Sequence, residues 1–305
     1  MRVLVLICAL IFAAWHGTGQ AACTVAERGS VPFTLVRGRL TVPLEVNGIP
    51  ATFVLDTGAQ LSLVTPQAVQ RLDLSRDRWV AATMHGVGGV VEHADADPRS
   101  MSLGGMQLRQ ATLARGISLT VGDLPGMGSA AVVDGLLGRD FLSEFDLQFD
   151  TAARRLTLYD VHGCSGRFLP WRSPYFAVPA ATVMPHLLVL PIALNGVRLT
   201  ALLDTGSSSS LVTLPGMIRL GLTPQMLADD PVALVRGIGR QAPAMHQHRF
   251  ESLQVGDETI RQPLIWVAPV RVVPFVDALL GADWLDEQRR VWISFATSTV
   301  FFQAR

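Results

Sequence analysis

The chain has 305 residues, of which 49% are hydrophobic and 16% charged, and its formal net charge is zero. This composition indicates a folded protein of one large or two medium domains, and it argues against long disorder and against nucleic-acid binding. All 25 basic residues are arginine, which excludes mechanisms that need a lysine amine, such as a pyridoxal Schiff base or a Ser-Lys dyad.

Residues 1–22 are predicted to be an export signal. Arg2 supplies a minimal positive charge, residues 3–15 form an apolar run, and Gly19 and Ala21 are small residues suited to cleavage after Ala21. The apolar run is short for a membrane span, so an uncleaved anchor is the less favoured alternative. We therefore expect a mature protein that is periplasmic or secreted.

Two cysteines, Cys23 and Cys164, lie outside the predicted signal. In an oxidising compartment they could form one disulfide that ties the mature N-terminus to the middle of the chain. Two unpaired thiols are the alternative, because pairing requires a specific geometry.

A segment near the N-terminus recurs in the second half of the chain. Residues 42–65 align without a gap with residues 190–213, and each copy contains two apolar runs joined by an Asn-Gly turn, which is typical of a β-hairpin. Each copy then places an aspartate after an apolar strand, in FVLDTGA for Asp56 and in ALLDTGS for Asp204. Burying an unpaired carboxylate is costly, so the matching contexts predict that these two aspartates meet.

Further elements follow in the same order in both halves. They are short helices at 66–74 and 215–222, glycine-rich hairpin tips at 85–90 and 236–240, strand pairs at 101–115 and 250–267, Leu-Leu-Gly strands with a short helix at 134–142 and 277–285, and closing hairpins at 147–159 and 291–302. This duplication predicts two similar β-rich lobes, at 23–160 and 190–305, with residues 161–189 as a linker and the first strands of the second lobe.

The order of these motifs resembles that of the pepsin/retropepsin clan of aspartic proteases. Each half contains two hydrophobic residues before Asp-Thr-Gly, then a glycine-rich flap, then two hydrophobic residues before Gly. The resemblance covers nearly the whole mature chain and implies an all-β, bilobal fold with two pseudo-symmetric lobes. Two glycine-tipped hairpins resemble the retropepsin-like branch, with a retroviral-style dimer fused into one chain, which implies a functional monomer.

The resemblance also implies an active site. Asp56 and Asp204 would share one proton, the ionised member activating a water and the protonated member acting on the scissile carbonyl, without a metal or cofactor. The residues that would support this pair are Thr57, Gly58, Ala59, Thr205, Gly206 and Ser207. The residues of the two flaps that would bind substrate are Gly86, Val87, Gly88, Gly89, Gly237, Ile238 and Gly239.

The two halves differ at two places near this site. Ala59 in the first turn corresponds to Ser207 in the second, and a Ser207 hydroxyl beside Asp204 would favour the charged carboxylate. We therefore expect Asp204 to be the more acidic partner. Arg139 corresponds to Ala282, a difference that affects the expected substrate preference rather than the pair of aspartates.

Other sites are less favoured. His246 and His248, with His85 and His93, could bind a metal, but no HExxH motif or cysteine cluster accompanies them. The serines at 207–210 lack a nucleophile-elbow pattern.

We expect an exported aspartic endopeptidase that acts on a peptide or protein, with the periplasmic part of a membrane protein as one candidate. The alternative is a catalytically idle peptide-binding module on the same fold.

Overall fold

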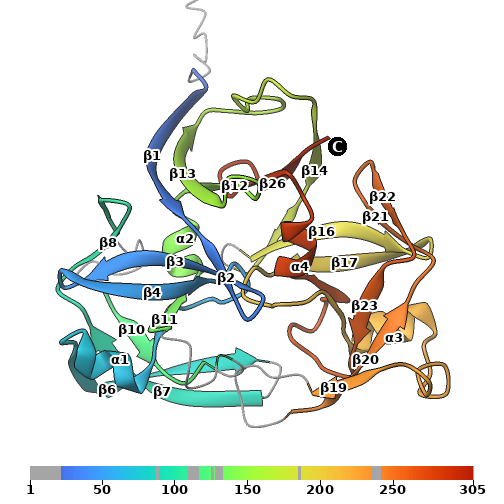
Figure 1. Cartoon of the computed structure of the whole chain (residues 1–305), viewed down its shortest axis with the longest axis horizontal. Coiled ribbons are helices and arrows are strands. Elements are labelled where there is room, and N and C mark those ends of the chain that lie inside the picture. Colours follow the sequence, from blue (N-terminus) through green and yellow to red (C-terminus); the bar gives the residue numbers. More distant parts are fainter. Residues whose placement is uncertain are drawn as a thin grey trace, which may run out of the picture.

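The computed structural model describes residues 22–86, 89–108, 117–124, 127, 133–184, 187–234 and 242–304, with the backbone alone for residues 77–86 and 89–93. Within these residues the chain is mostly β-structure, in three sheets with four short helices (Figure 1). The expected all-β, bilobal fold is confirmed. None of the helices in this part of the chain has the length and hydrophobicity needed to span a membrane.

The first lobe contains a ten-stranded sheet within the described residues. Its strand order is β6-β7-β10-β5-β11-β4-β3-β8-β9, and β2 pairs with β3. The strands are β2 (Thr34–Val36), β3 (Arg39–Val46), β4 (Ile49–Leu55), β5 (Leu63–Val64), β6 (Ser75–Gly86), β7 (Gly89–Asp97), β8 (Met101–Leu103), β9 (Met106–Gln107), β10 (Leu119–Val121) and β11 (Gly135–Leu137). Two helices, α1 (Pro66–Arg71) and α2 (Arg139–Leu142), accompany this sheet.

The second lobe repeats the first strand for strand. Its described strands follow the order β19-β20-β23-β18-β24-β17-β16-β21-β22, and β15 pairs with β16 as β2 does with β3. The strands are β15 (Ala181–Val183), β16 (Leu187–Leu194), β17 (Val197–Leu203), β18 (Leu211–Val212), β19 (Val232–Leu234), β20 (Ala244–Arg249), β21 (Ser252–Val255), β22 (Glu258–Arg261), β23 (Leu264–Val267) and β24 (Ala278–Leu280). The helices are α3 (Leu214–Leu220) and α4 (Ala282–Asp286). The sequence duplication is therefore a duplication of structure.

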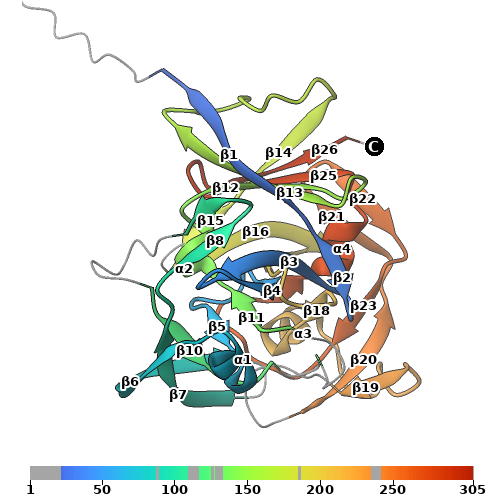
Figure 2. The same cartoon turned by 60° about the vertical axis from the view of Figure 1, so that its left-hand side comes forward.

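A third sheet joins the lobes. Its order is β1-β13-β12-β25-β26-β14, in which β12 of the first closing hairpin pairs with β25 of the second. The strands are β1 (Thr24–Pro32), β12 (Asp146–Asp150), β13 (Arg155–His162), β14 (Tyr175–Pro179), β25 (Arg290–Ser294) and β26 (Thr299–Gln303). Figures 1 and 2 show this sheet above both lobes, with β1 running down from it toward β2. The sequence predicted the two hairpins but not their union into one sheet.

The Asn-Gly turns have the backbone conformation that their sequence predicts. Asn47 and Gly48 have φ of 54° and 76°, and Asn195 and Gly196 have φ of 50° and 77°. Both central residues therefore lie in the left-handed region, which matches the twist of a two-residue β-hairpin. The Asn47 side chain also accepts a hydrogen bond from the N–H of Arg99 at 2.7 Å, so it fixes a neighbouring loop as well as the turn.

One continuous apolar core runs through both lobes and the central sheet. Phe53 of the first lobe, Leu203 of the second and Phe149 of the central sheet all belong to it and are at most 2% exposed. Strands that are buried on both faces explain the unbroken apolar runs before each Asp-Thr-Gly motif, because neither face of these strands meets water. The core therefore holds the two aspartate-bearing strands in a fixed relation.

Cys23 and Cys164 form a disulfide, so the alternative of two unpaired thiols is excluded. The bond joins the residue before β1 to the segment that follows β13, its neighbour in the central sheet, across a sequence separation of 141 residues. Constraining so long a loop in the unfolded chain favours the folded state.

Replacing both cysteines with serine should lower the free energy of unfolding by about 2–5 kcal/mol, because the unfolded chain regains the entropy of the open loop. Urea unfolding of the double variant and of the oxidised parent measures the difference. The parent treated with reductant should match the double variant. Equal unfolding midpoints for the oxidised parent and the double variant would show that the bond does not stabilise the fold.

Candidate active site

Each aspartate follows a strand that lies between two others. β4 pairs with β3 on one side and runs parallel to β11 on the other, and β17 lies in the same way between β16 and β24. The N–H of Asp56 donates to the Leu137 carbonyl at 3.0 Å, and the N–H of Asp204 donates to the Leu280 carbonyl at 2.9 Å. The Leu-Leu-Gly strands therefore fix the points at which the aspartate-bearing strands end.

The two Asp-Thr-Gly turns are bonded to each other through their threonines. The Thr57 hydroxyl donates to the Leu203 carbonyl at 2.7 Å and accepts from the N–H of Thr205 at 3.1 Å. Reciprocally, the Thr205 hydroxyl donates to the Leu55 carbonyl at 2.9 Å and accepts from the N–H of Thr57 at 3.1 Å. All four bonds are buried and all cross between the lobes. Thr57 and Thr205 therefore hold the two turns together across the lobe interface.

Each carboxylate is held by two N–H groups of its own turn. Oδ1 of Asp56 accepts from Gly58 at 3.0 Å and from Ala59 at 2.8 Å. Oδ1 of Asp204 accepts from the N–H groups of Gly206 and Ser207, both at 3.1 Å. Because these bonds use one oxygen of each carboxylate, they fix its orientation and favour its charged form.

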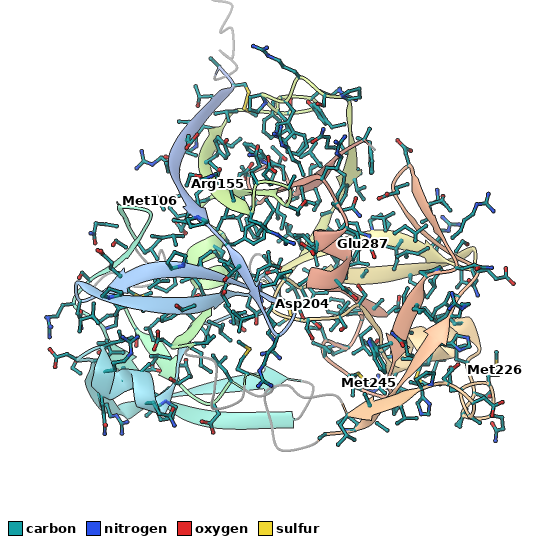
Figure 3. All side chains as sticks on the ribbon, in the orientation of Figure 1. Met106, Arg155, Asp204, Met226, Met245 and Glu287 are labelled. Carbon is teal, nitrogen blue, oxygen red and sulfur yellow. A yellow bond between two sulfur atoms is a disulfide. The ribbon has the colours of Figure 1, made fainter. Side chains whose placement is uncertain are left out.

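Each glycine of one turn lies against the carboxylate of the other turn. A β-carbon built on Gly58 would lie 2.7 Å from Cγ of Asp204, and one built on Gly206 would lie 2.2 Å from Cγ of Asp56. Such distances are too short for any side chain, so both positions require glycine. Asp204 is labelled in Figure 3, where it lies between the lobes. The fold therefore places Asp56 and Asp204 together at the lobe boundary.

Burial dominates the acidity of this pair. Loss of hydration, together with the charge of Asp56, raises the pKa of Asp204 to about 8. Burial also raises the pKa of Asp56, but the N–H of Ala59, the charge of Arg39 and a hydrogen bond from Asp204 oppose this rise. Both pKa values are therefore raised by loss of hydration, which favours a proton held by the pair.

The reason for expecting Asp204 to be the more acidic partner is not met in the structure. The Ser207 hydroxyl donates to the Ser209 carbonyl at 2.8 Å, so it is turned to its own loop. Ser207 contributes its backbone N–H to Asp204, as Ala59 does to Asp56. The residue type at this position consequently does not distinguish the two carboxylates.

A second layer of support beneath each turn was not predicted. Ser62 donates to Asp140 through its N–H at 3.0 Å and its hydroxyl at 2.7 Å, and its hydroxyl accepts from the N–H of Gly138 at 2.8 Å. Ser210 and Asp283 repeat the arrangement in the second lobe. The signal was present in the sequence, because each half has a serine shortly after Asp-Thr-Gly and an aspartate two residues after Leu-Leu-Gly.

The predicted flaps are described only in part. In the first, β6 and β7 form an antiparallel hairpin whose last pair is Gly86 with Gly89, whereas Val87 and Gly88 lie outside the described residues. In the second, β19 pairs with β20, and the strands flank residues 235–241. Gly237, Ile238 and Gly239 therefore also lie outside the described residues.

The histidine pair on β20 does not form part of a metal centre in the described residues. Nδ1 of His248 lies 2.7 Å from Oδ2 of Asp230, and His246 lies two residues earlier on the same strand. Among the described residues, no group of three or more His, Cys, Asp or Glu side chains is arranged to hold a metal ion.

Comparison with known proteins agrees with this geometry. No curated protein matches the chain. A family model, described as aspartyl protease, matches residues 42–141 and again residues 190–284, so one match covers each lobe and together they span more than half of the chain. Each matched region contains one aspartate-bearing turn and the Leu-Leu-Gly strand that supports it. The chain therefore belongs to the aspartyl protease family.

Proposed function

We propose that the protein is an aspartic endopeptidase that hydrolyses peptide bonds of a protein substrate through Asp56 and Asp204. The observation that supports this most strongly is the reciprocal packing of the two turns, in which the glycine of each lies against the carboxylate of the other. A peptide-binding module has no need of two half-buried acids held side by side, because removing carboxylates from water costs free energy. Hydrolysis uses them.

The proposed reaction needs only a water molecule and the substrate. Ionised Asp56 takes a proton from the water as the water oxygen attacks the scissile carbonyl carbon, and protonated Asp204 donates a proton to the carbonyl oxygen. The resulting neutral diol breaks down when its C–N bond breaks: Asp56 gives its proton to the nitrogen and Asp204 takes a proton from one diol hydroxyl, so that a carboxyl and an amine product form and the pair returns to its starting state. The N–H groups of Ala59 and Gly58 keep Asp56 oriented throughout.

The proposed substrate is an extended peptide bound between the lobes and the flaps. Extended segments add readily to exposed strand edges through main-chain hydrogen bonds, and β6–β7 and β19–β20 supply hairpins at corresponding ends of the two lobe sheets. A single chain carries both lobes, so we propose a functional monomer. No cofactor, metal or nucleic acid takes part in this proposal.

We further propose that the protein works outside the cytoplasm. The disulfide between Cys23 and Cys164 supports an oxidising compartment, and Cys23 follows closely on the predicted cleavage point after Ala21. The periplasmic part of a membrane protein is one candidate substrate, because a periplasmic protease meets such segments.

A peptide library tests the proposed activity. The mature chain, residues 22–305, is incubated with diverse peptides with and without a pepstatin-type inhibitor, and products are identified by mass spectrometry. We expect internal cleavage that the inhibitor blocks. Peptide binding without any cleavage would contradict the proposal and favour the idle module on the same fold. Cleavage that resists the inhibitor but not a metal chelator would point to a different mechanism.

Activity should follow a bell-shaped pH profile. The proposed reaction needs one proton on the pair, so kcat/KM should fall at low pH as Asp56 also becomes protonated, and at high pH as Asp204 loses its proton near pH 8. Initial rates on one library peptide between about pH 3 and pH 10 measure both limbs. A rate that keeps rising above pH 9 would contradict a proton held by Asp204.

A further inference from the structure

The hydrogen-bonded supports of the two turns match closely. Both turns give two N–H groups to their aspartate, and both rest on a serine bonded to an aspartate of the following helix. They differ at the first residue of that helix. It is Arg139 in α2 and Ala282 in α4.

Arg139 is a buried cation beside the first turn. It is only 4% exposed, its N–H donates to the Ala59 carbonyl at 3.0 Å, and its Nε donates to the same oxygen at 3.3 Å. The N–H of Ala59 in turn donates to Asp56 at 2.8 Å. The guanidinium is therefore connected to the Asp56 carboxylate through a single residue.

Ala282 makes the backbone contact without the cation. Its N–H donates to the Ser207 carbonyl at 2.8 Å, just as Arg139 does to Ala59, and the N–H of Ser207 reaches Asp204. Its side chain is a buried methyl group, 1% exposed. The second turn thus has the same geometry without the positive charge that the first turn has.

We propose that Arg139 is a positioning residue that makes Asp56, rather than Asp204, the ionised member of the pair. This inference rests on the proposed function, because it assigns the general base of that reaction. A guanidinium stays charged when buried, and a buried charge acts strongly on its neighbours because little water screens it. Without it, the near-symmetry of the two turns would leave the roles of the two aspartates almost interchangeable.

Other charged groups also act on the pair. Burial lowers the pKa of Arg139, and three carboxylates oppose that change, with Asp56 contributing most, Asp140 next and Asp204 least. Arg39 favours the charged form of both Asp56 and Asp204. Asp140 is itself bonded to Ser62 below the turn, and its place is taken by another aspartate in the second lobe. Arg139 is thus the cation that is bonded to one turn and replaced by a methyl group at the other.

A titration of each aspartate alone tests the proposal. The Asp204→Asn variant leaves Asp56 as the titrating member, and Asp56→Asn leaves Asp204. Each is made with Arg139 and with Arg139→Met, and the carboxyl midpoint is followed by ¹³C NMR. Removing the cation should raise the Asp56 midpoint by about one pH unit, because a nearby opposite charge favours the ionised form of a carboxyl group. The Asp204 midpoint should rise by less than half as much.

Equal rises in the two backgrounds, or a larger rise for Asp204, would overturn the proposal. Arg139→Gln keeps a donor near the Ala59 carbonyl without the charge, so the same comparison is made with it if the Met variant does not fold. The titration requires no cleavage, and it therefore decides the inference even if the protein hydrolyses no peptide. In the active chain, Arg139→Gln should move the acid limb of kcat/KM to higher pH, which a purely structural role would leave in place.

Discussion

Replacing Asp56 or Asp204 with Asn should lower kcat/KM by about 10³-fold or more, and the two variants should be similarly impaired. Asn cannot accept the proton of the attacking water as a carboxylate does, nor donate one as a carboxylic acid does, and the proposed reaction needs both roles. Because one role belongs to each lobe, neither lobe can compensate for the other. The measurement is the rate of cleavage of one library peptide by each variant and by the parent.

The Asp204→Asn variant should also be more stable than the parent. The folded state holds Asp204 at a pKa of about 8 against an ordinary value of 3.8, so its contribution to stability is present at low pH and is lost as the pH rises between these values. Asp204→Asn removes this loss, and at about pH 8 we expect a gain on the order of 2 kcal/mol in unfolding free energy. Urea unfolding at about pH 4 and pH 8 checks this, with a smaller gain at the lower pH. A variant that is both inactive and less stable would indicate a damaged fold instead.

Replacing Gly206 with Ala should also abolish most of the activity. The new β-carbon would lie 2.2 Å from Cγ of Asp56, so the turn or the carboxylate must move. Threonine hydrogen bonds also hold the two turns together, which leaves little room for adjustment. We expect a loss of about 10²-fold or more in kcat/KM, since small misplacements of reacting groups are that costly. We also expect a loss of about 1–3 kcal/mol in unfolding free energy from overpacking.

Gly29→Ala is the matched control for this substitution. A β-carbon on Gly29 would meet only ordinary contacts, at 3.6–3.8 Å, and its backbone does not require glycine. Gly29 lies in β1, away from the two turns. Parent-like activity in Gly29→Ala together with loss in Gly206→Ala would place the effect at the pair. If Gly206→Ala retained full activity, the two turns could not be as close as the structure has them.

The sequence predicted those parts of the site that short sequence motifs specify. The repeated apolar strand before Asp-Thr-Gly, the Asn-Gly hairpins and the two Leu-Leu-Gly strands all correspond to short stretches with a regular alternation or a required turn residue. Because these elements occur in the same order in both halves, the sequence also predicted two similar lobes. The repeated pattern is therefore enough to predict that Asp56 and Asp204 meet.

The central sheet and the acidity of the pair were beyond local patterns. Pairing of β12 with β25 joins strands more than a hundred residues apart, and periodicity alone does not choose the partner of a strand. The sequence does not show which acceptor the Ser207 hydroxyl takes, and only the folded loop shows that it bonds to the Ser209 carbonyl. Arg139 could be noticed as an asymmetry, but its position beside Asp56 required the fold.

The most direct test of the central claim counts the protons on Asp56 and Asp204 in the parent chain. We expect ¹³C-detected titration of the two carboxyl groups to give two well-separated midpoints, the upper near pH 8, because two adjacent carboxyl groups that have lost part of their hydration cannot both ionise at little cost. A pepstatin-type inhibitor should change both. Two overlapping midpoints near pH 4, as for independent exposed aspartates, would show that the two halves do not form one proton-sharing site.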